Sequence, residues 1–126
     1  GMDYIACGSP DISFHGTKPW YPDLSNYSRV IGIMLCGKYA PLTIRKSDKS
    51  FYMAFNMHWE AHRFELPVLP KGKKWKVIID TYQLYLDFEQ TEKEKNNVPN
   101  KKGKSGETAL LEYMVNPRTV VVFEEE

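Results

Sequence analysis

Short apolar runs, separated by proline, glycine and charged clusters, dominate the hydrophobic pattern of the chain. Residues 29–36 (RVIGIMLC) are apolar on both faces, as expected of a central sandwich strand. Residues 51–57 (FYMAFNM) alternate Phe and Met with Tyr, Ala and Asn, which predicts a half-buried strand with the larger apolar set on one face. Further strands are predicted at 62–66, 74–80 and 119–123. The chain is therefore expected to be mostly β.

One segment has a different composition. Residues 91–107 (TEKEKNNVPNKKGKSGE) contain one valine and are otherwise polar, charged, Gly or Pro. Such a segment buries too little apolar area to offset the entropy of ordering it, which predicts a long, flexible, exposed loop. Strand-like sequence resumes at Leu110, so the loop lies inside the domain. The only helix candidate is 81–89, and Asp80 before it is interpreted as a strand-end residue, not a catalyst.

About six to eight short strands at this spacing predict a single antiparallel β-sandwich of the Greek-key type, in one domain over residues 1–126. A small barrel is the alternative. Trp75 is expected in the core. Gly1 before Met2 is typical of a tag remnant, which leaves open that these residues are one domain of a longer protein.

Charge and composition disfavour several classes of function. Lys and Arg number 17 against 16 Asp and Glu, a net charge of +1, so we expect neither a nucleic-acid partner nor a membrane. No stretch approaches the ~20 consecutive apolar residues of a membrane span. Cys7 and Cys36 are too few for a disulfide framework, so we expect reduced thiols and a cytoplasmic protein.

The densest group of candidate functional side chains lies in residues 12–25 (ISFHGTKPWYPDLS), which contain a histidine, three aromatics, two prolines and an aspartate. This segment fits an active site, a sugar-stacking platform or a structural joint. Exposed indole and phenol rings can stack on the apolar faces of pyranose rings, and Trp20, Tyr21 and Trp59 are the candidates. The alternative is that these rings cover loop or domain contacts.

A second cluster is His58-Trp59-Glu60-Ala61-His62, in which two histidines flank a glutamate. The zincin motif instead places glutamate directly after the first histidine and needs a helix to align both rings. At about 3.3 Å per residue, the two histidines of an extended strand would stand roughly 13 Å apart, although a turn would shorten this. We therefore expect a hairpin corner with exposed histidines, no metal and no cofactor.

Three blocks of sequence together resemble one domain family. ISFHGTKP, followed by YPDLSNYSRVIGIMLCG, is similar to the W-H-G-x-x-P, x-P-D-W-S and S-R-x-L/V-A-F/W-x-L segments of that family. FYMAFNMHWEAHRFELPVLPKGKKWKVIIDT and YMVNPRTVVVF resemble its later strands. The family is the C-terminal domain of isoamylase-type glycogen and starch debranching enzymes of the α-amylase superfamily. Phe14 and Leu24 stand where the family has tryptophan, and Thr119 where it has serine. Leucine cannot stack on a sugar as an indole does.

The resemblance implies an antiparallel β-sandwich carried behind a catalytic (β/α)₈ barrel that hydrolyses α-1,6 branch linkages. The motifs that hold the barrel's catalytic residues do not occur in this sequence, so no catalytic residue is carried over and the chain is expected to be inactive by itself. Its barrel partner would normally cover part of its surface. The candidates for contact with the barrel or with substrate are His15, Trp20, Tyr21, Asp23 and Trp59.

Three functions remain open at this point. The first is a noncatalytic C-terminal domain that supports the barrel, the second a glucan-binding module with surface aromatics, and the third an immunoglobulin-like interaction domain without a link to glucans. Within the first two, residues 12–25 are interpreted as a joint that leads into the sandwich. His15 is interpreted as a hydrogen-bonding bracket, because no neighbouring residue supplies a nucleophile for it to activate. We also expect an exposed patch that contains His15, Trp20, Tyr21 and Trp59.

Overall fold

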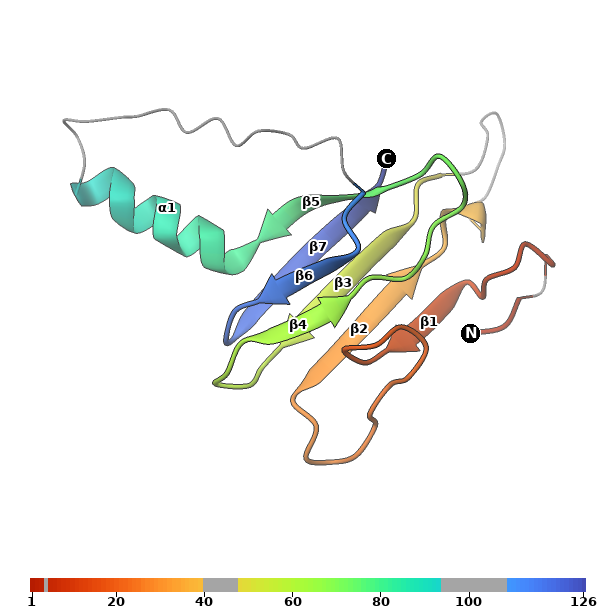
Figure 1. Cartoon of the computed structure of the whole chain (residues 1–126), viewed down its shortest axis with the longest axis horizontal. Helices are drawn as coiled ribbons and strands as arrows, with labels where there is room; N and C mark the ends of the chain where they lie inside the picture. The colour runs from red at the N-terminus through yellow and green to blue at the C-terminus, as the bar shows by residue number, and fades with distance from the viewer. Residues whose placement is uncertain (4, 40–47, 94–108) are drawn as a thin grey trace.

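The computed structural model describes residues 1–3, 5–39, 48–93 and 109–126 and shows a two-layered arrangement of strands (Figure 1). All-β architecture is confirmed, and the described strands form two open sheets instead of a barrel. In chain order the elements are β1 (Ile12–His15), β2 (Val30–Leu35), a 3₁₀ turn η1 (Gly37–Tyr39), β3 (Phe51–Asn56), β4 (His62–Glu65), β5 (Trp75–Asp80), α1 (Thr81–Lys93), β6 (Glu112–Val115) and β7 (Thr119–Glu125).

The large sheet has the strand order β1-β2-β3-β7-β5, and the small sheet pairs β4 with β6. All pairs are antiparallel. The chain leaves the large sheet after β3, forms β4, and returns for β5. After β6 it returns again as β7, which lies between β3 and β5 (Figure 1). The last strand of the sequence therefore completes the centre of the large sheet.

The core lies between the inner face of the large sheet and the small sheet. Its largest buried side chains, Tyr52, Phe64 and Phe123, are fully inaccessible to solvent. Trp75 is buried as predicted, and its indole Nε1 donates to the Pro67 carbonyl at 2.8 Å. The full core consists of Met34, Tyr52, Ala54, Phe64, Leu66, Trp75, Val115, Val121 and Phe123.

Strand β3 shows the predicted alternation, but the side that it buries is not the one with more apolar residues. Tyr52, Ala54 and Asn56 are fully buried, whereas the intervening Phe and Met side chains are half-exposed. The Tyr52 ring fits on this side because the neighbouring residue in β2 is a glycine. Gly32 of β2 pairs with Ala54 of β3, and a Cβ atom on Gly32 would collide with the Tyr52 ring. The close fit of the Tyr52 ring over Gly32 thus helps to place this side of β3 in the core.

Helix α1 confirms the helix predicted at 81–89 and continues to Lys93. The predicted loop at 91–107 therefore begins too early, because Glu, Gln and Lys are good helix formers that extend the helix. Residues 94–107 of that loop lie outside the described residues. Asp80 is confirmed as a strand-end residue: its Oδ1 accepts from the backbone N–H groups of Tyr82 and Gln83, which caps the helix.

The segment 12–25, interpreted as a joint, consists of a strand followed by a loop. Its first four residues form β1, an edge strand that pairs with β2, and only the remainder is a loop. This loop turns tightly, since the N–H groups of Gly16 and Tyr21 both donate to the Lys18 carbonyl. The Glu65 N–H donates to the Thr17 carbonyl at 2.8 Å, which ties the loop to the end of β4.

Candidate functional site: the open face and the arch

The outer face of the large sheet is apolar across all five strands. The pairing registers place Phe14, Ile33, Met53, Val122 and Ile79 in one row that crosses the whole sheet. In the described part of the chain, every one of these side chains is at least partly exposed. We call this surface the open face; it consists of Ile12, Phe14, Ile31, Ile33, Leu35, Phe51, Met53, Phe55, Ile79, Val120 and Val122.

The open face is a functional candidate because a contiguous apolar patch of a few hundred Å² on a protein surface is often functional. Four strand spacings of about 4.8 Å make it about 19 Å wide, and four residues along β3 add about 13 Å. The flat area of the face, calculated from the backbone spacings alone, is then about 250 Å², and it is continuous. Sequence reasoning did not assign it, because the alternation of β3 showed two faces without showing which one the small sheet covers.

His15, the first sequence candidate, is fully buried on the inner face of β1. Its Nδ1 accepts the Trp20 backbone N–H at 2.9 Å, so the neutral ring carries its proton on Nε2 and donates it to Ser13 Oγ at 2.7 Å. Burial lowers the pKa of His15 to about 4. The interpretation of His15 as a hydrogen-bonding bracket is confirmed, and its prediction as part of an exposed patch is wrong.

The aromatic candidates are exposed, as predicted, but they do not form one cluster. Trp20 is 49 % exposed and its ring packs on His15, with centroids 4.6 Å apart. Its φ of 70° lies in the left-handed region, at a cost of about 1 kcal/mol that the bond to His15 helps to offset. Tyr21 and Trp59 are 77 % and 68 % exposed. Trp20 and Trp59 are thus each anchored on a histidine ring, the second with centroids 4.2 Å from His58.

Asp23 and Trp59 both line one hollow on the surface, which has a volume of about 290 Å³. It is lined by Asp23, Tyr27, Ser28, Arg29, Val30, His58, Trp59 and His62. A second hollow, of about 360 Å³, shares Asp23 and Arg29 but is lined also by Ile31, Phe55 and Met57. Because Ile31 and Phe55 belong to the open face, the segment 23–30 joins the open face to the first hollow.

The connection between β3 and β4, which we call the arch, consists of residues 57–61 and crosses from one sheet to the other. It is not the corner of a hairpin, since β3 and β4 pair with different strands. The ring of His58, in the arch, meets the ring of His62, the first residue of β4: His58 Nδ1 lies 3.0 Å from His62 Nε2. The expectation of exposed histidines is also wrong, because both are half-buried.

The two cysteines are free thiols, as expected. Cys36 follows β2 and is half-buried, and burial raises the pKa of its thiol, which keeps it in the less reactive protonated form. In the described part of the chain, no helix has the length and apolar character needed to cross a membrane.

The fold and the open face define a two-layered all-β domain whose large sheet has one covered and one uncovered face. A protein-family model described as "Isoamylase 1-3, C-terminal" matches residues 13–116, most of the chain. The chain therefore belongs to the family of isoamylase C-terminal domains, as its sequence motifs indicated. A search of curated proteins gave no match. The family supports a noncatalytic domain of a debranching enzyme.

Proposed function

We propose that this domain supports the (β/α)₈ barrel of a glycogen- or starch-debranching enzyme, which hydrolyses α-1,6-glucosidic branch linkages, and that the open face is where the barrel packs. The observation that carries the proposal is the apolar row from Phe14 to Ile79. Family membership supports a catalytic domain in the same parent chain as the partner. A cytoplasmic location is part of the proposal and is supported by the free thiols.

The size of the open face fits an interface between domains of one chain. Such interfaces bury about 600–1,500 Å² in total, or about 300–750 Å² on each side. The flat area of about 250 Å² supplies most of the lower limit. An exposed apolar side chain beside the face can add to it: Leu24, which lines the second hollow together with Ile31 and Phe55, is 73 % exposed.

A pair of charge insertions tests this proposal. The chain is mixed with the separately produced catalytic domain of its parent enzyme, and association is measured by titration calorimetry. Val122→Lys places a cation within the open face, beside Met53, while the Lys stem can lie along the sheet without unfolding it. Val68→Lys makes the same change in the β4–β5 connection, where Val68 is already 93 % exposed. We expect Val122→Lys to weaken association at least about tenfold and Val68→Lys to leave it unchanged. Equal effects would contradict the proposal.

Glucan binding is the second candidate, and the first hollow favours it. Tyr27 and Trp59 line it while 75 % and 68 % exposed, and Asp23 and Arg29 provide hydrogen-bonding groups beside them. Exposed aromatic faces next to polar groups suit the alternating apolar faces and hydroxyl rims of a glucan.

Affinity electrophoresis in gels that contain glycogen or amylopectin tests this second candidate. Retarded migration that Trp59→Ala abolishes, and that Tyr85→Ala on α1 preserves, would support it. Tyr85 is a suitable control because it is 58 % exposed and lies outside the hollow. Unretarded migration of the unchanged chain would argue against glucan binding without affecting the packing proposal.

A further inference from the structure

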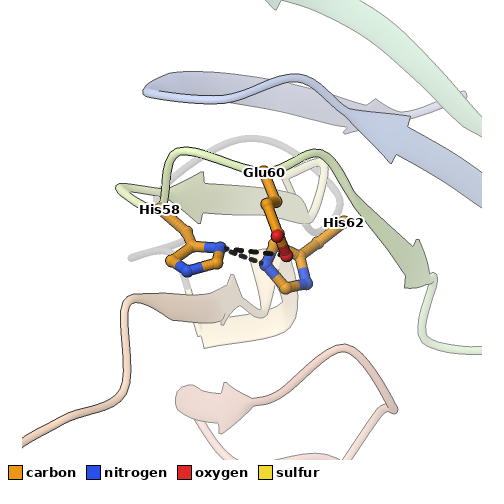
Figure 2. Close-up of side chains that lie close together, drawn as sticks. All are labelled: His58, Glu60 and His62. Atoms are coloured by element: carbon orange, nitrogen blue, oxygen red, sulfur yellow. Dashed lines mark hydrogen bonds and ion pairs between the residues drawn. The ribbon is translucent and has the colours of Figure 1, made fainter.

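The arch and the first residue of β4 bring together three side chains that are common metal ligands. His58, Glu60 and His62 each direct one ligand atom toward the others, and these atoms all lie within 4.8 Å of one another (Figure 2). The expectation that no metal binds here rested on a separation of roughly 13 Å for an extended chain. The arch bends the chain, so the spacing of four residues brings the rings together without a helix.

The distances between the ligand atoms suit a small divalent ion. Zinc–nitrogen bonds of about 2.05 Å with a tetrahedral angle place two nitrogens about 3.3 Å apart. His58 Nδ1 and His62 Nε2 are 3.0 Å apart, so an opening of a few tenths of an ångström admits the ion. The Glu60 carboxylate is 3.9 Å from His58 Nδ1, and its side chain, 69 % exposed, is free to rotate inward.

The protonation of the rings also permits coordination. A neutral imidazole has one nitrogen with a free lone pair and one N–H. One of the two nitrogens in the hydrogen bond between the rings carries a proton. When the ion replaces this hydrogen bond, that ring changes tautomer by proton exchange with water, so that His58 carries its proton on Nε2 and His62 on Nδ1. Nδ1 of His58 and Nε2 of His62 then each have a free lone pair for the ion, and the number of protons on the two rings is unchanged.

A buried side chain holds the arch in this shape. Asn56 is fully buried, and its Nδ2 lies 2.8 Å from the Glu60 carbonyl and 3.1 Å from the Val115 carbonyl. Its Oδ1 accepts from the His58 N–H at 3.0 Å. The His58 carbonyl accepts from the Arg118 N–H at 3.1 Å. The backbone between the ligands is therefore fixed by the fold, as a preorganised site requires.

The His58 ring is restrained as well, because it packs on Trp59 with ring centroids 4.2 Å apart. From this geometry we propose that His58, Glu60 and His62 form a binding site for a divalent transition-metal ion of the Zn²⁺ class. Two imidazoles and one carboxylate are a ligand set that such ions accept, and water completes the coordination. The ion would join the end of β3 to the start of β4. This inference does not rest on the packing of a catalytic domain proposed for the open face.

Zinc binding to the chain, freed of metal by dialysis, tests the proposal by titration calorimetry. We expect one equivalent of Zn²⁺ to bind, and His58→Gln and His62→Gln each to weaken binding about tenfold or more. Glu65→Gln changes an exposed carboxylate on β4 outside the cluster and is expected to bind as the unchanged chain does. A hundredfold excess of Zn²⁺ over Kd should raise Tm by about 10 °C.

Binding by the thiols must be distinguished, since thiolates also bind zinc. The titration is therefore repeated with the Cys7→Ser/Cys36→Ser chain, which is expected to bind equally well. Loss of binding in that chain would overturn the proposal. So would unsaturable binding to the unchanged chain, or unchanged affinity in both histidine variants.

Nitrogen-15 NMR of the unchanged chain tests the proposal without histidine variants, and therefore also if one of these variants fails to fold. In ¹⁵N-labelled chain, Zn²⁺ should shift the ring nitrogens of His58 and His62 and leave those of His15, which is buried and hydrogen-bonded at both nitrogens, unchanged. Unchanged signals of His58 and His62 would overturn the proposal.

Discussion

The two faces of the large sheet have similar apolar content and opposite environments. On β7, Val121 is fully buried and its neighbour Val122 is half-exposed. On β3, fully buried Tyr52 and Ala54 alternate with half-exposed Phe51 and Met53. The inner face is closed by the small sheet, whereas the outer face remains open in the described chain. Hydrophobicity alone therefore does not identify the core of this domain, and the uncovered apolar face is the surface proposed above to receive a partner.

The largest predicted difference between the faces concerns two phenylalanines. Phe123→Ala removes a fully buried ring from the core and should lower the free energy of unfolding by about 4 kcal/mol. Phe55→Ala, on the open face, should cost about 1 kcal/mol, because the ring is already half-exposed. Urea unfolding followed by circular dichroism measures both, and equal costs would mean that the open face is part of the core.

The pH dependence of stability tests the inner face at His15. Its pKa in the folded state is about 4, below the ordinary value of 6.5, so the unfolded chain binds more protons between these pH values. Stability is thus fully present above pH 6.5 and should fall by about 3 kcal/mol as the pH decreases to 4. His15→Gln should be less stable at pH 7 and should lose most of this slope. An unchanged slope in urea unfolding of the variant would assign it to other groups.

Two nearly isosteric substitutions, at the adjacent residues Val121 and Val122 of β7, compare the buried and the open face directly. Val121→Thr buries a hydroxyl in the core and should cost about 2 kcal/mol, whereas Val122→Thr should cost less than about 0.5 kcal/mol because its hydroxyl reaches water. Thermal unfolding of both variants measures the difference. If Val122→Thr cost as much as Val121→Thr, the open face would not be solvent-accessible.

The smallest predicted effect concerns the Tyr52 hydroxyl, which is buried and has no hydrogen-bond partner among the described residues. Burial raises the pKa of this hydroxyl, consistent with a neutral group kept from water. Tyr52→Phe removes the unsatisfied group and should leave stability unchanged or raise it by up to about 1 kcal/mol. A loss of more than about 1 kcal/mol in urea unfolding would show that the hydroxyl has a partner.

The sequence predicted most of the fold because alternation with period two identifies strands directly. β2, β3, β4, β5 and β7 begin and end within two residues of their predicted bounds. β1 was not recognised, because its four residues precede a loop rich in Pro and aromatic residues that dominates the local pattern. Periodicity identifies strands but not a protein family. The family motifs indicate the family, and with it a catalytic domain as the expected neighbour.

The candidate site was only partly predictable, for reasons of geometry. Exposure of Trp20, Tyr21 and Trp59 followed from their positions in loops. The burial of His15 did not, because it depends on hydrogen bonds to both ring nitrogens that only the folded loop provides. The approach of His58 to His62 depends on Asn56, whose hydrogen bonds to the backbone of the arch form only in the folded chain.

Methionine oxidation tests the central claim, that the open face packs on a catalytic domain, most directly. Met53 lies on the open face, and Met114 lies on β6 of the small sheet, where it is 45 % exposed. Oxidation by hydrogen peroxide, followed by mass spectrometry, compares the two sites in this chain and in the intact parent enzyme. The account predicts that Met53 becomes protected in the intact enzyme while Met114 does not. Equal oxidation of Met53 in both proteins, or protection of Met114 alone, would contradict it.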